Sequence, residues 1–163
     1  MTSSNRTWRT LAVALRIAVG VVFAYAALAK MYRFEFVGHS LRVEKLHWIV
    51  FAGAIGDYKV LPDWAVVPLA RSLPWVELVI GVMLIAGLGT RIAATACSVL
   101  LAGFFGLMVR AQILHMNISC GCFGPTGDII SWRTLLRDGT LLAASLIVTW
   151  TSFARRKPLP GKW

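Results

Sequence analysis

Four long apolar segments constrain the fold of this chain more than any other feature. They cover roughly residues 11–29, 66–88, 92–114 and 132–154. Each is near the length that a helix needs to cross about 30 Å of hydrocarbon at about 1.5 Å per residue. Because backbone polar groups in lipid must bond within their own segment, we expect all four to be helices. The predicted fold is all-α, a four-transmembrane-helix bundle that forms a single integral membrane domain.

The composition supports this class and excludes others. Hydrophobic residues make up 58% of the 163 residues and charged residues only 15%, whereas soluble domains average about 45–50% and about 25%. A soluble domain and a disordered chain are therefore both excluded. The net charge of +10 would suggest nucleic acid as the partner of a soluble protein. Here the basic residues mostly flank apolar segments, so we expect them to face anionic lipid and no nucleic acid.

The basic flanks also predict an orientation in the cell membrane. Arg9 precedes the first segment, Arg91 lies in the short turn between the second and third, and residues 155–157 (Arg, Arg, Lys) follow the fourth. Four spans place these groups on one side, which the positive-inside rule assigns to the cytoplasm. Both termini are then cytoplasmic in a multi-pass protein. Residues 30–65 and 115–131 are predicted to be extracytoplasmic.

Two parts of the N-terminal third leave alternatives open. The first apolar segment loosely resembles a secretory signal that ends at Ala24-Tyr25-Ala26, although Arg16 interrupts it and the apolar run is long for a signal. In the long first extracytoplasmic segment, Leu41 to Ile55 mixes apolar, aromatic and cationic residues. That pattern predicts a helix lying on the membrane surface. A loop packed over the bundle fits this stretch equally well.

The strongest chemical motif is the pair of cysteines, Cys120 and Cys122, on either side of Gly121. Two cysteines form a disulfide when their Cα atoms lie about 4.4–6.8 Å apart, and the glycine permits the turn that this spacing requires. So small a ring is strained, and strain raises the reduction potential. We therefore expect the two thiols to form a redox pair that exchanges with the thiols of another protein.

Other interpretations of this pair remain open at the sequence level. The two thiols could form an inert structural disulfide, although so short a loop gains little entropic stabilisation. They could also bind a metal with His115, although this set lacks the usual ligand spacing. We predict no metal site. Cys97 lies about 35 Å along the third helix from Cys120, so we expect it to be a small apolar filler.

A second signal is Glu77, a carboxylate inside the second apolar segment. Ionisable groups within a span are costly and are functional candidates by default. We expect Glu77 to be paired, with Lys30 at the end of the first span or Arg110 near the end of the third as its partner. A structural ion pair that fixes the helix register explains the same residues equally well. Arg110 also begins a polar string that leads into the cysteine loop, and Arg137 and Asp138 near the outer end of the fourth segment could join that string.

Several pieces spread over about residues 11–154 resemble a known family. They are Ala27-Leu28-Ala29-Lys30, Leu61-Pro62, Leu73-Pro74-Trp75-Val76-Glu77-Leu78-Val79-Ile80-Gly81 and Cys120-Gly121-Cys122-Phe123-Gly124. With these pieces the chain resembles the DoxX-like superfamily, and within it the MauE branch of redox-associated membrane proteins. The resemblance implies a four-helix membrane protein that works beside a thioredoxin-like partner in forming or maintaining disulfides outside the cytoplasm. MauE itself is associated with maturation of the disulfide-rich small subunit of methylamine dehydrogenase.

The leading hypothesis is therefore a membrane thiol–disulfide redox protein. Cys120 and Cys122 would cycle between dithiol and disulfide with an extracytoplasmic thioredoxin-fold protein. Glu77, with Lys30 or Arg110, would manage the coupled protons. A quinone is a candidate electron partner, for which the sequence shows no dedicated site. Two alternatives are a non-catalytic membrane assembly factor and a small proton-coupled transporter, so whether the chain is an enzyme stays open.

Overall fold

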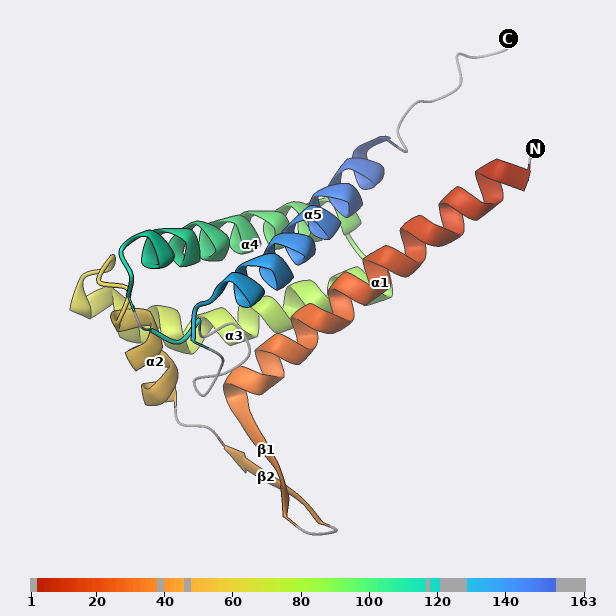
Figure 1. Cartoon of the computed structure of the whole chain (residues 1–163). Coiled ribbons are helices and arrows are strands. Elements are labelled where there is room, and N and C mark those ends of the chain that lie inside the picture. The colour runs from red at the N-terminus through yellow and green to blue at the C-terminus, as the bar shows by residue number, and fades with distance from the viewer. Residues whose placement is uncertain (1–2, 38–39, 46–47, 117, 121–128, 155–163) are drawn as a thin grey trace.

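The computed structural model describes residues 3–37, 40–45, 48–116, 118–120 and 129–154. Of residues 3–6, 33–37, 40–45 and 48–50 it describes the backbone. The elements in chain order are α1 (Ser3–Met31), β1 (Tyr32–Val37), β2 (Ser40–Lys45), α2 (Trp48–Gly56), α3 (Asp63–Ala86), α4 (Thr90–Ile113) and α5 (Trp132–Ala154). The four long helices form a bundle, and the hairpin of β1 and β2 extends away from it (Figure 1).

Three of the four predicted spans are helices long and apolar enough to cross a membrane. They are Thr7–Met31 within α1, Asp63–Ala86 and Thr90–Ile113. The fourth predicted segment is the helix α5, but its first turns carry Arg133, Arg137 and Asp138, and α5 is not among the candidate spans. The chain is a membrane protein with three candidate spans in its described part.

The outer face of the bundle is apolar, as a lipid-facing surface must be. Large apolar side chains on the three candidate spans are exposed, among them Val21, Val79 and Val99. Exposed apolar surface on this scale marks contact with a membrane or a partner. The interior instead contains small, aliphatic and aromatic side chains together with the polar groups Lys30 and Glu77.

The segment between α1 and α3 differs from the expectation. We left open a surface helix or a packed loop from Leu41 to Ile55, but the structure has the strand β2 over Ser40–Lys45 and begins the helix α2 at Trp48. β1 pairs with β2 in antiparallel register, with Tyr32 opposite Lys45. Apolar and charged residues alternate along both strands, which is the period of a strand and not of a helix. Within the described residues, this hairpin is the exception among elements that are otherwise helices.

The helices pack as two pairs. α1 lies along α3 and α4 lies along α5, while the contacts between the pairs are less extensive. The α3–α4 turn uses the left-handed conformations of Gly87 (φ 77°) and Gly89 (φ 52°), which glycine adopts without steric cost. This turn, the start of α1 and the end of α5 lie at one end of the bundle (Figure 1). We call the opposite end, near Met31, Ile113 and Trp132, the cysteine end.

Hydroxyl groups join α4 and α5 near the middle of these helices. Ser98 Oγ donates to Ser145 Oγ at 3.1 Å and lies 2.9 Å from Thr149 Oγ1. Ser145 and Thr149 also donate to main-chain carbonyls of α5 at 2.8 and 3.0 Å. We call Ser98, Ser145 and Thr149 the hydroxyl cluster.

Candidate functional site

The α1–α3 contact brings two main chains unusually close. A Cβ atom added at Gly81 would lie 2.8 Å from the nitrogen of Ala24 and 2.9 Å from the carbonyl oxygen of Gly20. Main-chain atoms cannot give way as a flexible side chain can, so only glycine fits at this position. Small residues allow helices in membranes to approach in this way. The contact fixes how α1 and α3 are rotated relative to each other. It therefore also determines which side chains of the two helices meet closer to the cysteine end.

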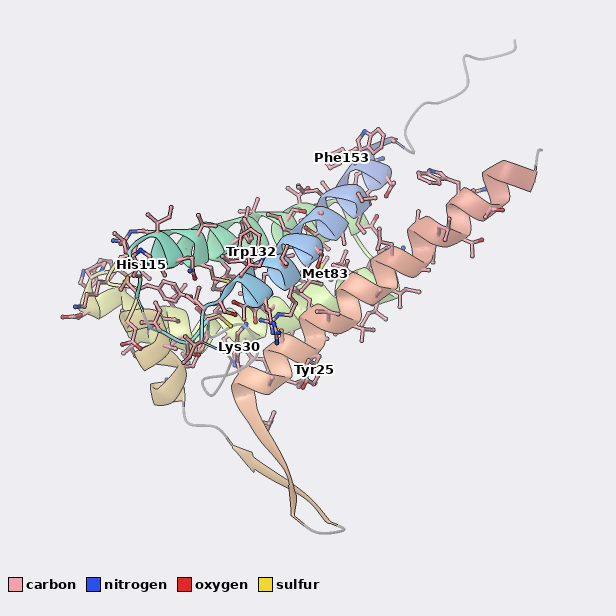
Figure 2. All side chains as sticks on the ribbon, in the orientation of Figure 1. Tyr25, Lys30, Met83, His115, Trp132 and Phe153 are labelled. Atoms are coloured by element: carbon pink, nitrogen blue, oxygen red, sulfur yellow. The ribbon has the colours of Figure 1, made fainter. Side chains whose placement is uncertain are left out.

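Lys30 and Glu77 meet beyond that contact, at the cysteine end. Lys30 Nζ donates to Glu77 Oε1 at 2.7 Å and to Oε2 at 2.6 Å. Their exposed fractions are 3% and 2%, so water does not screen the pair. The ammonium also lies 5.6 Å from the ring centroids of both Phe51 and Phe104. Lys30 projects from the end of α1 into the bundle (Figure 2).

Asp138 of α5 approaches this ion pair from the other helix pair. With Lys30, Glu77 and Phe104 it lines a cavity of about 30 Å³. Asp138 is 6% exposed. Its Oδ1 accepts a hydrogen bond from Arg137 Nε at 3.1 Å, whereas its buried Oδ2 has no hydrogen-bond partner among the residues that the structure describes. A buried carboxylate oxygen without a donor is costly, so this atom is a candidate proton acceptor.

Arg137 connects Asp138 to Cys120. Its Nη2 donates to Cys120 Sγ at 3.7 Å while its Nε donates to the carboxylate. Cys120 is itself 4% exposed, and its carbonyl oxygen accepts a hydrogen bond from the hydroxyl of Tyr58 at 3.3 Å. A cation beside a cysteine stabilises the thiolate, which is the reactive form in thiol exchange. We call Lys30, Glu77, Arg137 and Asp138 the charged cluster.

The residues on either side of the loop that contains Cys122 lie close together, beside Arg137. Ser119 and Ile129 form an antiparallel bridge, and the N–H of Ile130 donates to the carbonyl of Ile118 at 3.0 Å. These contacts hold the two ends of the loop together beside Arg137. Gly121 and Cys122 lie outside the described residues, so the predicted Cys120–Cys122 pair is not tested by the structure.

The remaining sequence candidates lie in different surroundings. Arg110 Nη1 donates to the carbonyl oxygen of Tyr58 at 3.1 Å, so of the two proposed partners it is Lys30 that pairs with Glu77. Arg110 instead binds Tyr58, whose hydroxyl donates to the carbonyl oxygen of Cys120. Cys97 is fully buried in a core cluster with Val19 and Leu84, separate from the cluster that contains Cys120.

Tyr58 is the site residue that the sequence analysis missed. It follows α2 at the base of the long first segment, and its ring packs in the same buried cluster as Cys120. A buried aromatic ring with a polar tip usually finds a hydrogen-bond partner. That preference alone could not identify Cys120 as the partner, because 62 residues separate the two in the chain.

The arrangement places groups that can hold protons next to a thiol. Lys30 and Glu77 belong to the α1–α3 pair, whereas Arg137 and Asp138 belong to α5, and a small cavity lies between them. Asp138 therefore lines the same cavity as the Lys30–Glu77 ion pair, and Arg137 connects it to the sulfur of Cys120. Such a site can stabilise a thiolate and store the proton that it releases.

Comparisons with known proteins identify relatives over most of the chain. A family model described as "Methylamine utilisation protein MauE" matches residues 8–151. The methylamine utilization protein MauE of Paracoccus denitrificans is 30% identical over 137 residues, which is 83% of this chain and 66% of the relative. The protein of the same name from Paracoccus versutus is 32% identical over 136 residues, or 82% of this chain and 65% of the relative.

A further relative matches over a shorter stretch. MauE of Methylophilus methylotrophus is 33% identical over 101 residues, which is 60% of this chain and 53% of the relative. The chain thus spans about two thirds or less of the length of the curated relatives it matches. No solved structure matches the chain.

Proposed function

The chain belongs to the MauE family, and from this premise we propose that it is a membrane thiol–disulfide redox protein. It supports disulfide formation or maturation of extracytoplasmic proteins, as an accessory of methylamine utilisation or a similar pathway. The observation that carries the proposal is the 3.7 Å contact between Arg137 Nη2 and Cys120 Sγ at the base of the cysteine loop. It supports a reactive thiol because a cation favours the thiolate.

The chemistry is a two-electron exchange with a thioredoxin-fold partner. A thiolate of the reduced partner attacks the Cys120–Cys122 disulfide, the S–S bond breaks, and a mixed disulfide forms. The second thiolate of the partner then attacks that bond and releases the second cysteine of this chain. The partner has lost two electrons and two protons, and Cys120 and Cys122 have become thiols.

The charged cluster manages the protons of this cycle. When Cys120 is reduced to a thiolate, the Arg137 guanidinium stabilises the new negative charge before a proton arrives. Asp138 Oδ2 has no donor among the described residues and lies on the cavity shared with Lys30 and Glu77. We assign it the role of holding that proton. Arg110 supports the site indirectly, through the carbonyl oxygen of Tyr58.

The same proposal includes α5 as a fourth span. α5 has 23 residues, about 34 Å at 1.5 Å per residue, which is enough to cross the hydrocarbon. Its polar residues Thr134, Asp138 and Ser145 are buried against the other helices and so would avoid lipid. With four spans, Arg9 and Arg91 lie on the cytoplasmic side together with both termini. The cysteine loop then faces the oxidising side of the membrane.

Thiol trapping in membranes tests the function. Cys120→Ser and Cys122→Ser should each abolish disulfide exchange with a thioredoxin-fold dithiol, and a trapped mixed disulfide should identify the partner. Cys97→Ser is the matched control, because Cys97 is buried in a different core cluster, and it should exchange normally. If the double cysteine variant retains full activity in the cell, the redox role is wrong and a non-catalytic assembly factor is favoured.

A further inference from the structure

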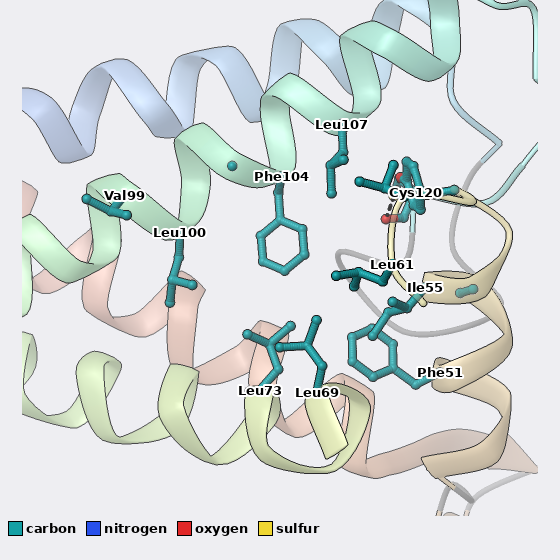
Figure 3. Close-up of a pocket in the computed structure, with 14 residues that line it drawn as sticks. Phe51, Ile55, Leu61, Leu69, Leu73, Val99, Leu100, Phe104, Leu107 and Cys120 are labelled. Carbon is teal, nitrogen blue, oxygen red and sulfur yellow. Dashed lines mark hydrogen bonds between the residues drawn. The ribbon is translucent and has the colours of Figure 1, made fainter. Parts of the chain in front are cut away.

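An apolar cavity of about 250 Å³ lies next to the charged cluster, between α2, α3 and α4. Phe104 and Leu100 of α4 face Leu69 and Leu73 of α3 across it, and Phe51 of α2 lies at its side (Figure 3). Almost all of its lining is apolar, and Cys120 belongs to its wall. Cavities with mostly apolar walls and few polar groups are typical binding sites for small molecules.

The cavity can be reached from the surface that faces lipid. Two of its lining residues on the candidate spans, Leu69 and Val99, are 37% and 66% exposed. Gly103 also lines it, and a Cβ atom added there would meet no atom within 4 Å. Glycine inside a helix costs about 1 kcal/mol relative to alanine. At position 103 the glycine leaves the cavity open, because a larger side chain would fill it.

The cavity and the buried ion pair share a wall. The rings of Phe51 and Phe104 line the cavity, and each centroid lies 5.6 Å from Lys30 Nζ. Tyr58 also lines the cavity, and its hydroxyl donates to the carbonyl oxygen of Cys120. A molecule bound here would therefore contact Cys120 of the cysteine loop, and the rings of Phe51 and Phe104 would separate it from the Lys30 ammonium.

We propose that this cavity binds the ring of a membrane quinone that takes electrons from Cys120 and Cys122. The inference rests on the proposed function, because reoxidation of the two thiols needs an acceptor of two electrons. An apolar cavity of about 150 Å³ holds a benzene ring, so this larger one has room for a substituted ring. The isoprenoid tail leaves between Leu69 and Val99 toward the lipid.

The reaction balances without any further reactant. The two thiols lose two electrons and two protons, and the Cys120–Cys122 S–S bond forms. The quinone gains two electrons and two protons and becomes the quinol. The quinol leaves through the same lateral opening, so that oxidising equivalents flow from the lipid phase to the partner protein.

Binding and turnover of a short-chain ubiquinone by the full-length protein test this inference. The reduced protein, purified in detergent without oxygen, should form one quinol for each pair of thiols lost. Gly103→Leu should slow quinol formation at least tenfold, because its side chain occupies the cavity. Gly106→Leu is the matched control, since this α4 glycine also has no atom within 4 Å of an added Cβ but does not line the cavity.

A binding measurement separates the cavity from the thiol chemistry. The oxidised quinone should raise the melting temperature of the Cys120→Ser/Cys122→Ser variant, which cannot react, and should leave that of Gly103→Leu unchanged. The melting temperature without ligand shows whether Gly103→Leu still folds. Farnesol, an isoprenoid alcohol without the ring, should stabilise neither variant.

Two outcomes would overturn the quinone site. Equal quinol formation by Gly103→Leu and Gly106→Leu would place the reaction elsewhere, and equal stabilisation by farnesol would make the cavity a lipid site. In both cases exchange with the thioredoxin-fold dithiol would still proceed, and the proposed function would stand. Loss of that exchange in the unmodified protein would instead overturn the proposed function itself.

Discussion

Two polar clusters lie inside this apolar bundle, and they are built differently. In the hydroxyl cluster, Ser98 Oγ contacts the hydroxyls of Ser145 and Thr149, and each of these two donates to a nearby carbonyl. The charged cluster instead contains two ion pairs, Lys30–Glu77 and Arg137–Asp138, and the Oδ2 atom of Asp138 has no hydrogen-bond partner among the described residues. Neutral, satisfied groups join helices at little cost. Buried charges with an unmet hydrogen-bonding need are costly, and inside a span they are candidates for a functional role.

The largest effect should come from breaking the ion pair. Glu77→Gln leaves the Lys30 ammonium buried without an opposite charge, so we expect the free energy of unfolding to fall by about 3–5 kcal/mol. Denaturant unfolding in detergent measures this change. The control is the double variant Lys30→Met/Glu77→Leu, which should recover most of the stability because no lone charge remains. A Glu77→Gln protein as stable as the unmodified one would contradict the distinction between the charged cluster and the hydroxyl cluster.

An intermediate effect is expected on the reactivity of Cys120. In reduced protein carrying Cys122→Ser, Arg137→Gln should slow alkylation of Cys120 at pH 7 by about threefold to tenfold, because less thiolate is present. Asp138→Asn should accelerate alkylation, since the carboxylate no longer offsets the charge of Arg137. Peptide mass spectrometry gives the rate at Cys120. If both substitutions change the rate in the same direction, the assigned electrostatic roles are wrong.

The smallest effect should come from the hydroxyl cluster. Ser98→Ala removes two interactions, but Ser145 and Thr149 keep their bonds to main-chain carbonyls. Hydrogen bonds between helices in membranes average about 0.6 kcal/mol, so we expect a loss of about 1 kcal/mol or less in the same unfolding measurement. Thiol exchange should be unchanged. A loss as large as that of Glu77→Gln would remove the distinction between the clusters.

Local sequence patterns predicted the long helices well. The four apolar segments correspond to α1, α3, α4 and α5, because length and hydrophobicity are properties of a single segment. The hairpin was missed because the apolar and charged residues of Tyr32–Val37 alternate over only a few positions, too few to outweigh the helical interpretation of the residues that follow.

The contacts within the site were harder to predict. Glu77 was identifiable from its charge inside an apolar segment, but choosing Lys30 over Arg110 requires the rotation of α1 against α3. That rotation depends on the packing of Gly20 against Gly81, which pairs two distant segments. The contact between Arg137 and Cys120 depends in the same way on how α5 follows the cysteine loop.

The division of the bundle into two tight helix pairs has a mechanical consequence. Main-chain contact at Gly81 holds α1 closely against α3, and the hydroxyl cluster joins α4 to α5. The contacts between the two pairs are less extensive than those within each pair, and Lys30 and Asp138 lie on opposite sides of the boundary between the pairs. A small shift of one pair against the other would therefore change the distance between Asp138 and the Lys30–Glu77 ion pair without unpacking either pair.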